Sequence, residues 1–365
     1  MLRIPINTKS HQYEVLIQEG LLRRAGTLLR EVLGGTPAVF VVTVAPVRRR
    51  WGKVLLNSME NAGFATRIIE MRDGERYKRL STLDTLAENM VRFGADRKAL
   101  VIAFGGGVVG DVAGMLASVY MRGVKLVQIP TTVQAQLDAA IGGKTGVNLQ
   151  AGKNLVGTFY QPEVVLIDTG VLETLPQREF RSGMYEAIKT GIIGNAKLFA
   201  KLENSSIKGL RSNSSAVTYA IAESVKLKAN VVSADEREGG LRRVLNLGHT
   251  LGHALEAATE YRHFLHGEAV AWGMQAAARI ALDMRLCDQS TYESICTAVH
   301  AWGPLPEVNV QNAKAMKLLL SDKKTERGTV HFVLPCEIGK VEIVKNVPES
   351  AIVTALAEIR RASRA

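Results

Sequence analysis

Runs of β-branched hydrophobic residues recur along the first half of the chain, and they alternate with stretches of helical periodicity. Because these runs are continuously rich in valine and isoleucine, they are typical of strands buried on both faces, as in a parallel sheet with crossover helices. The pattern predicts strands at residues 38–43, 65–70, 99–104, 125–129 and 163–168.

Beyond about residue 175 the strand pattern nearly disappears, and apolar residues follow the helical period instead. A chain of 365 residues also exceeds what one hydrophobic core usually holds. We therefore expect an α/β, Rossmann-like nucleotide-binding domain over residues 1–172 and an all-α domain over 173–365. The pattern predicts helices at 178–193, 213–233, 246–258, 266–285, 289–302 and 311–320, with a short hairpin near 329–344.

Composition narrows the class of protein. Hydrophobic residues make up 47% and charged residues 22%, as in ordinary globular proteins, and there is no apolar run long enough for a membrane span or signal peptide. The three cysteines lack metal-ligand or disulfide spacing, which suits the cytoplasm. The net charge of +11 comes with only 5% aromatic residues, which disfavours base stacking and nucleic-acid binding. We therefore expect the positive charge to attract a small anionic substrate.

Four of the seven histidines fall within eighteen residues, at His249, His253, His263 and His266. His249 and His253 lie four apart in a predicted helix and so share one face. Clustered imidazoles of this kind can gather around a divalent metal ion, although single histidines are more often ordinary core or surface residues. The cluster predicts a metal site, and spacing alone would pair His249 with His253.

A glycine-rich turn, GGGVVGD at residues 105–111, directly follows a predicted strand and precedes a helix. This is the setting of the G-x-G-x-x-G dinucleotide-binding motif, in which the backbone closely approaches a pyrophosphate. No acidic residue follows about twenty positions later to bind the ribose. The motif therefore indicates a variant dinucleotide site, and a plain tight turn before a helix is the alternative.

Two lysines lie among glycines in the next loops, Lys144 in GGKTGVN (142–148) and Lys153 in GKN (152–154). The spacer of a nucleotide-binding P-loop is missing, and Asp138 would repel a nucleotide phosphate. The lysines instead suit a small phosphate or carboxylate. Glu186 and Lys189, three apart on a predicted helix, would by themselves be interpreted as a surface ion pair.

Taken together, these motifs resemble the sugar-phosphate cyclases, and most closely the 3-dehydroquinate synthases of the shikimate pathway. The resemblance follows the chain in order over nearly its whole length, which makes it specific. It rests on DGERYK (73–78), GGGVVGDVAGMLASVYMRG (105–123), PTTVQAQLDAAIGGKTGVN (130–148), GKNLVGTFYQP (152–162), EAIKTG (186–191), DEREGGLRRVLNLGHTLGHALE (235–256), HGEAV (266–270) and DKK (322–324).

The resemblance implies one catalytic metal ion, zinc or cobalt, bound by Glu186, His249 and His266, with His253 facing the substrate instead of the metal. It also implies NAD as a cofactor. The NAD-contacting residues would be Glu75, Lys78, Gly107, Asp111, Thr131, Thr132, Lys144, Lys153 and Thr174. The catalytic and substrate-contacting residues would be Arg122, Asp138, Lys144, Asn154, Lys189, Lys228, Arg242, Asn246, His253 and one of Lys323 and Lys324.

The activity implied is the conversion of 3-deoxy-D-arabino-heptulosonate 7-phosphate to 3-dehydroquinate and phosphate. In that family NAD oxidises the substrate at C5, phosphate leaves by β-elimination, the hydride returns, and an intramolecular aldol reaction closes the ring. We expect a cytoplasmic homodimer that acts on a small sugar phosphate and binds neither nucleic acid nor membranes.

The alternatives are another cyclase, of the 2-epi-5-epi-valiolone or 2-deoxy-scyllo-inosose synthase type, or a metal-dependent alcohol or glycerol dehydrogenase. A dehydrogenase would not need so many phosphate-directed cations. A non-enzymatic binding protein would leave the predicted metal ligands without a role.

The chain departs from the family pattern in two places. Ala139 and Ala140 replace a common serine pair. Where the family usually has Asp and Asn near the cofactor, this chain has Val44 and Pro46. Because valine cannot accept a hydrogen bond from a cofactor hydroxyl, this departure predicts weaker NAD binding than in a Val44→Asp variant.

Overall fold

The computed structural model describes residues 1–35, 37–323 and 330–364 and the side chains of all these but residues 320–323. The chain forms two compact units. Unit 1 consists of residues 1–176 and 214–237, and unit 2 of residues 177–213 and 238–365. The chain therefore passes from one unit to the other three times.

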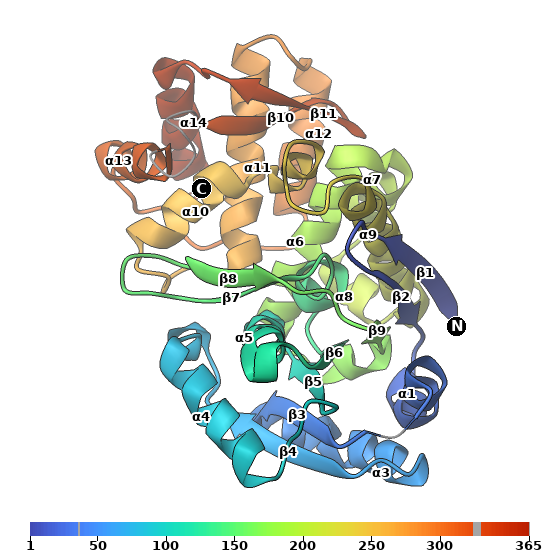
Figure 1. The fold of residues 1–365 in the computed structure, drawn as a ribbon. Coiled ribbons are helices and arrows are strands. Elements are labelled where there is room, and N and C mark those ends of the chain that lie inside the picture. The colour runs from blue at the N-terminus through green and yellow to red at the C-terminus, as the bar shows by residue number, and fades with distance from the viewer. Residues whose placement is uncertain (36, 324–329, 365) are drawn as a thin grey trace. The chain divides into compact units, whose positions relative to one another are not determined.

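Unit 1 is built on a seven-stranded sheet (Figure 1). The first pair of strands is antiparallel, and the remaining neighbours are parallel. All five predicted strands are confirmed to within about one residue, whereas the N-terminal hairpin was not predicted. In spatial order the strands are β1 (Leu2–Asn7), β2 (Gln12–Ile17), β9 (Val164–Ile167), β6 (Lys125–Pro130), β5 (Leu100–Gly105), β3 (Val39–Val44) and β4 (Thr66–Met71).

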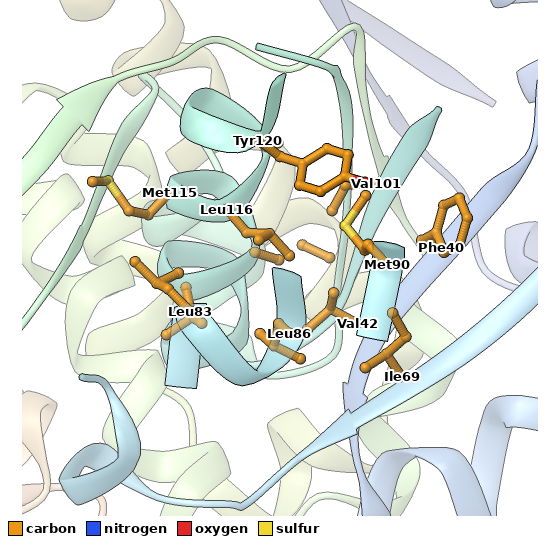
Figure 2. Close-up of a cluster of buried hydrophobic side chains, with 14 of the residues drawn as sticks. Phe40, Val42, Ile69, Leu83, Leu86, Met90, Val101, Met115, Leu116 and Tyr120 are labelled. Carbon is orange, nitrogen blue, oxygen red and sulfur yellow. The ribbon is translucent and has the colours of Figure 1, made fainter. Parts of the chain in front are cut away.

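Both faces of this sheet are covered by helices, which explains the continuously apolar strands. Along β3, Val39 and Val41 pack with α1 (Ala25–Leu33) and α3 (Lys53–Asn61). Phe40 and Val42 point to the opposite face and pack with α4 (Leu80–Arg92) and α5 (Gly107–Val119), the cluster drawn in Figure 2. Because successive strand residues point to opposite faces, two buried faces leave no position for a polar alternation.

The order of the strands reverses between β3 and β5, since β4 lies on one side of β3 and β5 on the other. In open α/β sheets, ligands bind outside the carboxyl ends of the strands at such a switch point. The glycine-rich turn follows β5 at this position. Several other predicted site residues of unit 1, among them Glu75, Asp138 and Thr174, lie on its short helices and its second hairpin. These elements are η1 (Leu21–Arg24), α2 (Ala45–Val47), η2 (Arg48–Gly52), η3 (Glu75–Tyr77), η4 (Tyr120–Arg122), η5 (Ala135–Ala139), the hairpin β7 (Lys144–Val147) and β8 (Val156–Phe159), and η6 (Thr169–Thr174).

The predicted helix at 213–233 is present as α9 (Ser214–Ala234), but it belongs to unit 1. It packs against β1 and η5, where the Asn7 amide donates to Ser233 Oγ at 3.1 Å. The sequence placed one boundary between residues 172 and 173, with this helix in the C-terminal domain. The structure instead returns to unit 1 for α9, because the N-terminal hairpin provides a surface that the helix covers.

The described residues of unit 2 are helical apart from one hairpin. The predicted helices and the predicted hairpin are present, whereas α7, α8 and α14 were not predicted. The helix α11 packs against α6, α10, α12 and α14. Among the described residues, no helix is long and apolar enough to span a membrane. The elements are α6 (Gln177–Gly194), α7 (Ala196–Glu203), α8 (Ile207–Arg211), η7 (Leu241–Asn246), α10 (His249–Ala258), α11 (His266–Asp283), α12 (Gln289–His300), α13 (Asn312–Lys323), β10 (His331–Glu337), β11 (Lys340–Lys345) and α14 (Glu349–Ala362).

Candidate functional site

Three histidines of unit 2 converge. His249 and His253 lie one turn apart on α10, and His266 is the first residue of α11. The ring centroid of His249 lies 5.3 Å from the ring centroid of His253 and 5.1 Å from that of His266. One nitrogen from each of the three rings lies within 4.8 Å of the others, an arrangement that can hold a metal ion. Three of the four histidines of the predicted cluster thus come together. His263 is not in this group: its ring lies against Phe264, and its Nε2 is 2.9 Å from the Glu307 carbonyl oxygen.

Glu186 of α6 faces two of these rings. Its side chain is fully buried, and its Oε1 lies 3.5 Å from His266 Nε2 and 3.8 Å from His249 Nε2. Its other oxygen, Oε2, forms an ion pair with Lys189, and Oε1 has no hydrogen-bond partner among the described residues. A buried carboxylate oxygen without a hydrogen bond, opposite two imidazole nitrogens, fits a divalent cation bound by one oxygen and two nitrogens. The interpretation of Glu186 and Lys189 as a surface ion pair is wrong, because the pair is buried.

The pKa values of Glu186 and His249 favour binding of a cation, whereas that of His266 opposes it. Burial by itself would raise the pKa of Glu186, but Lys189, His266 and His249 hold that pKa well below its usual range. Burial, together with Lys189, holds the pKa of His249 well below its ordinary value, so its ring is neutral. Burial would also lower the pKa of His266, but Glu186 and Glu256 raise it to about 10. A cation would therefore compete with the His266 proton.

The two helices that carry Glu186 and His266 are held together beside the cluster. Gly267 allows this approach, since a Cβ atom there would lie 1.8 Å from the Ser182 carbonyl oxygen of α6. Glu268, fully buried, accepts hydrogen bonds from Arg178 Nε and Nη2 on α6, both at 2.7 Å. The His-Gly-Glu sequence therefore supplies a candidate ligand, a close helix contact and an ion pair in three consecutive residues.

Other predicted residues of unit 2 add buried polar groups. Lys189 forms an ion pair with Glu186 and is 4% exposed, while Arg242 of η7 is 2% exposed. The side-chain Nδ2 of Asn246 donates a hydrogen bond to Glu238 Oε1 at 3.0 Å. His253 is exposed, in contrast to His249. Lys324 and the side chains of Asp322 and Lys323 lie outside the described residues.

In unit 1, Lys78 is the centre of a polar network near the glycine-rich turn. It is 4% exposed, forms an ion pair with Asp111 of α5, and donates to Asn154 Oδ1. Asn148 extends the network. Its side chain donates a hydrogen bond to Glu75 Oε1 at 2.7 Å and accepts one from the backbone N–H of Asn154 at 2.9 Å. Burial raises the pKa of Asp111 despite the opposing effect of Lys78. Four predicted residues are thus joined through Asn148, which was not predicted.

The glycine-rich turn lies against the loop after β6. The Thr131 amide donates to the Gly105 carbonyl at 2.9 Å. A Cβ atom on Gly106 would lie 3.1 Å from Thr132 Cγ2, which is tighter than ordinary packing allows. Gly107 is the first residue of α5. The structure therefore brings Gly107, Thr131 and Thr132 to the carboxyl ends of β5 and β6, beside the switch point between β3 and β5.

The remaining predicted residues of unit 1 are more scattered. Lys228 of α9 forms an ion pair with Asp138 Oδ1 at 2.5 Å. Lys144 begins β7 and is exposed, and Lys153 Nζ lies 3.9 Å from Glu75 Oε1.

Two further residues lie at the ends of short helices. Thr174 Oγ1 accepts a hydrogen bond from Trp51 Nε1 at 3.0 Å. Arg122 is exposed, with a left-handed backbone (φ 72°).

The family follows from comparison with known proteins. A model of the 3-dehydroquinate synthase N-terminal region matches residues 68–182, and a model of its C-terminal region matches residues 183–325. The chain belongs to the 3-dehydroquinate synthase family. A 3-dehydroquinate synthase of Koribacter versatilis is 49% identical over 360 residues, which cover 99% of this chain and 98% of the relative.

Two solved structures of related cyclases have the same fold. A 2-deoxy-scyllo-inosose synthase, in complex with carbaglucose-6-phosphate, NAD⁺ and Co²⁺, matches with a TM-score of 0.88 and 26% identity, covering 98% of this chain and 99% of that one. A 2-epi-5-epi-valiolone synthase of Streptomyces hygroscopicus, with NAD⁺ and Zn²⁺ bound, gives a TM-score of 0.87 and 29% identity, covering 96% and 97%. The predicted fold class, an α/β domain and a helical domain of the dehydroquinate synthase type, is confirmed.

Sequence reasoning missed several residues that support the predicted groups. Asn148 links the Lys78 network, Arg178 and Glu268 join two helices, and Glu256 contacts His266. A signal was available for Glu256, which lies seven residues after His249 and therefore on the same face of α10. For Arg178 and Glu268 there was none, because their contact spans 90 residues of sequence.

Proposed function

We propose that this member of the 3-dehydroquinate synthase family catalyses the family's reaction, a carbon–oxygen lyase reaction that depends on NAD and a metal ion. It would convert 3-deoxy-D-arabino-heptulosonate 7-phosphate to 3-dehydroquinate and phosphate. The observation that carries the proposal is the 49% identity to a 3-dehydroquinate synthase over 99% of the chain. The buried Glu186 opposite His249 and His266 supports it independently.

The metal would be zinc or cobalt, held by Glu186, His249 and His266. These residues fit such an ion, since the buried Glu186 offers a carboxylate oxygen that lies opposite one imidazole nitrogen of His249 and one of His266. Two related cyclases contain Co²⁺ or Zn²⁺. When bound, the ion supplies a Lewis acid for substrate hydroxyl groups. Three protein ligands would leave room for substrate oxygens.

NAD would be bound by unit 1, and when bound it supplies a hydride acceptor and donor at one substrate carbon. The glycine-rich turn at the switch point supports this assignment, as do the two related cyclases with NAD⁺. The proposed contacts remain those predicted from the sequence. They are Glu75, Lys78, Gly107, Asp111, Thr131, Thr132, Lys144, Lys153 and Thr174.

The predicted cationic substrate contacts would bind the phosphate and carboxylate of the substrate. Arg242 and Lys189 are almost fully buried, and Lys228 is 8% exposed. A cation with little access to water interacts more strongly with an anion than an exposed one does. Charge-assisted hydrogen bonds from these groups would fix the orientation of a dianionic sugar. The other proposed substrate contacts are Arg122, Asp138, Lys144, Asn154, Asn246, His253 and one of Lys323 and Lys324.

His253 is the residue of the histidine cluster best suited to transfer protons. It is exposed, whereas His249 and Glu186 are buried. An imidazole that is not needed as a metal ligand can exchange protons with a substrate at neutral pH. The cytoplasmic location and the homodimer stay predictions from the sequence.

Phosphate release tests the proposed function directly. We expect the purified protein with NAD and Zn²⁺ to release phosphate from the heptulosonate phosphate, with no lasting accumulation of NADH. A heptulose phosphate that lacks the carboxylate should be a poor substrate. Preference for that compound would favour another cyclase activity, and NADH formed in step with product would favour a dehydrogenase.

A further inference from the structure

The ring of His266 has a carboxylate at each nitrogen. Its Nε2 lies 3.5 Å from Glu186 Oε1, and its Nδ1 lies 3.2 Å from Glu256 Oε2. Glu256 belongs to α10 and is 4% exposed. If Nε2 binds a cation, it must lack a proton, and the Nδ1 atom must then carry one. An Nδ1–H group that faces a buried carboxylate donates a strong, charge-assisted hydrogen bond to it.

We propose that Glu256 is a positioning residue of the metal site, acting through His266. Its carboxylate would accept the Nδ1 proton of His266, fix the ring in the orientation that aims Nε2 at Glu186, and increase the basicity of Nε2. Carboxylates that bind the second nitrogen of a metal-ligating histidine act in this way, and their loss typically weakens metal binding about 10- to 100-fold. This inference rests on the proposed metal site.

The other candidate ligand provides an internal comparison. His249 Nδ1 lies 3.2 Å from the backbone carbonyl of Leu247. A carbonyl can only accept a hydrogen bond, so His249 also carries its proton on Nδ1 and presents Nε2 to Glu186. Both rings are thus oriented through Nδ1. The difference is the charge of the Nδ1 partner. Within the described part of the chain, His266 has an anionic partner at Nδ1 and His249 a neutral carbonyl, and the anionic partner can be removed by mutation.

The position of Glu256 on α10 explains why this helix can serve both ligands. Glu256 lies seven residues after His249, two turns along the same face. The helix α10 packs closely on α11, since a Cβ atom on Gly252 would lie 3.1 Å from the Ala269 carbonyl oxygen. One helix therefore supplies a ligand of its own and the carboxylate that orients the ligand of its neighbour.

The test is the affinity for Zn²⁺, measured by competition with a chromophoric chelator. In Glu256→Gln the amide oxygen still accepts the Nδ1 proton but carries no charge, and we expect about 10-fold weaker binding. In Glu256→Leu the acceptor is lost, and we expect about 100-fold weaker binding. Glu260→Gln is the matched control, because it removes one negative charge four residues later from an exposed ion pair with Arg262. Its affinity should equal that of the unaltered protein.

The inference is overturned if both Glu256 variants bind zinc as tightly as the Glu260→Gln control, even if they melt at a lower temperature. His266→Ala separates this result from failure of the proposed site, since full zinc retention there would refute the ligand set itself. If Glu256→Leu does not fold, Glu256→Gln and ¹⁵N spectra of the zinc-loaded protein still decide. We expect the proton of His266 on Nδ1, and a proton on Nε2 would refute the proposal.

Discussion

Removing Arg178 should expose how much the ion pair with Glu268 stabilises unit 2. Arg178 is about half exposed, with 52% of its side chain accessible, so Arg178→Ala creates no cavity. Glu268 is fully buried and would lose two hydrogen bonds of 2.7 Å. Two contacts of the Glu268 carboxylate would remain among the described residues. The backbone amide of Leu265 donates to Oε2 at 2.9 Å, and Arg181 Nη2 lies 3.7 Å from Oε1.

Breaking a buried ion pair by removing one partner typically costs about 3–5 kcal/mol, because the other charge is left buried. Arg181 remains close enough to offset part of this cost. We therefore expect Arg178→Ala to lower the free energy of unfolding of unit 2 by about 3 kcal/mol. Replacing Glu268 as well should recover part of the loss, since the unpaired buried charge would be gone.

Chemical denaturation followed by tryptophan fluorescence measures this loss. Trp272 and Trp302 lie in unit 2 and Trp51 in unit 1, so Trp51→Phe as a common background would report on unit 2 alone. The single variants Arg178→Ala and Glu268→Gln and their combination form a double-mutant cycle. We expect a coupling free energy above about 1 kcal/mol. Additivity within about 0.5 kcal/mol would refute the argument, because it would mean that the two side chains do not stabilise each other.

Three further predictions concern the proposed activity. His249→Ala should lose bound zinc and phosphate release together, and elemental analysis that still finds one zinc per chain would refute its role as a ligand. Lys78→Met should weaken NAD binding in calorimetric titration, because the network around Asp111 and Asn154 loses its central cation; unchanged affinity would make Lys78 a purely structural residue. Arg122→Ala should raise KM for the sugar phosphate but change unfolding by less than about 0.5 kcal/mol, as expected for an exposed side chain, and a large stability loss with normal kinetics would contradict the substrate role.

The structure changes one expectation drawn from the sequence, that Val44→Asp would strengthen NAD binding. Val44 is 5% exposed and packs in the apolar cluster between the sheet and α4 and α5. A carboxylate at that position would be buried among hydrocarbon groups, which is costly without a partner. We now expect Val44→Asp to lower the free energy of unfolding, and we no longer expect it to strengthen NAD binding. A thermal melt of the variant without NAD would check this.

Much of the fold was predictable because its signals are local. The strands β3 and β5 are apolar on both faces, and the spacing of His249 and His253 already places them on one side of a helix. Glu186 is different. Its burial opposite His266 depends on the packing of α6 against α11, which no local pattern encodes, and only the resemblance to a family suggested it as a ligand.

The parts missed share the same cause. The N-terminal hairpin is partnered by a strand about 150 residues later in the chain, and α9 covers it from a position later still. Contacts over such distances in sequence leave no periodic signal in either segment. The division of the chain into two contiguous stretches was therefore too simple.

The interrupted course of the chain has a consequence for its synthesis on the ribosome. The strand β1 is made long before α9, which packs on it and ends at residue 234. Between residues 177 and 237 about 60 residues must be added, which takes roughly 3–12 s at ordinary rates of elongation. During that interval the nascent sheet lacks one of its covering helices. A chaperone that binds exposed apolar strands would meet this protein at a defined stage of translation, before residues 238–365 have been made.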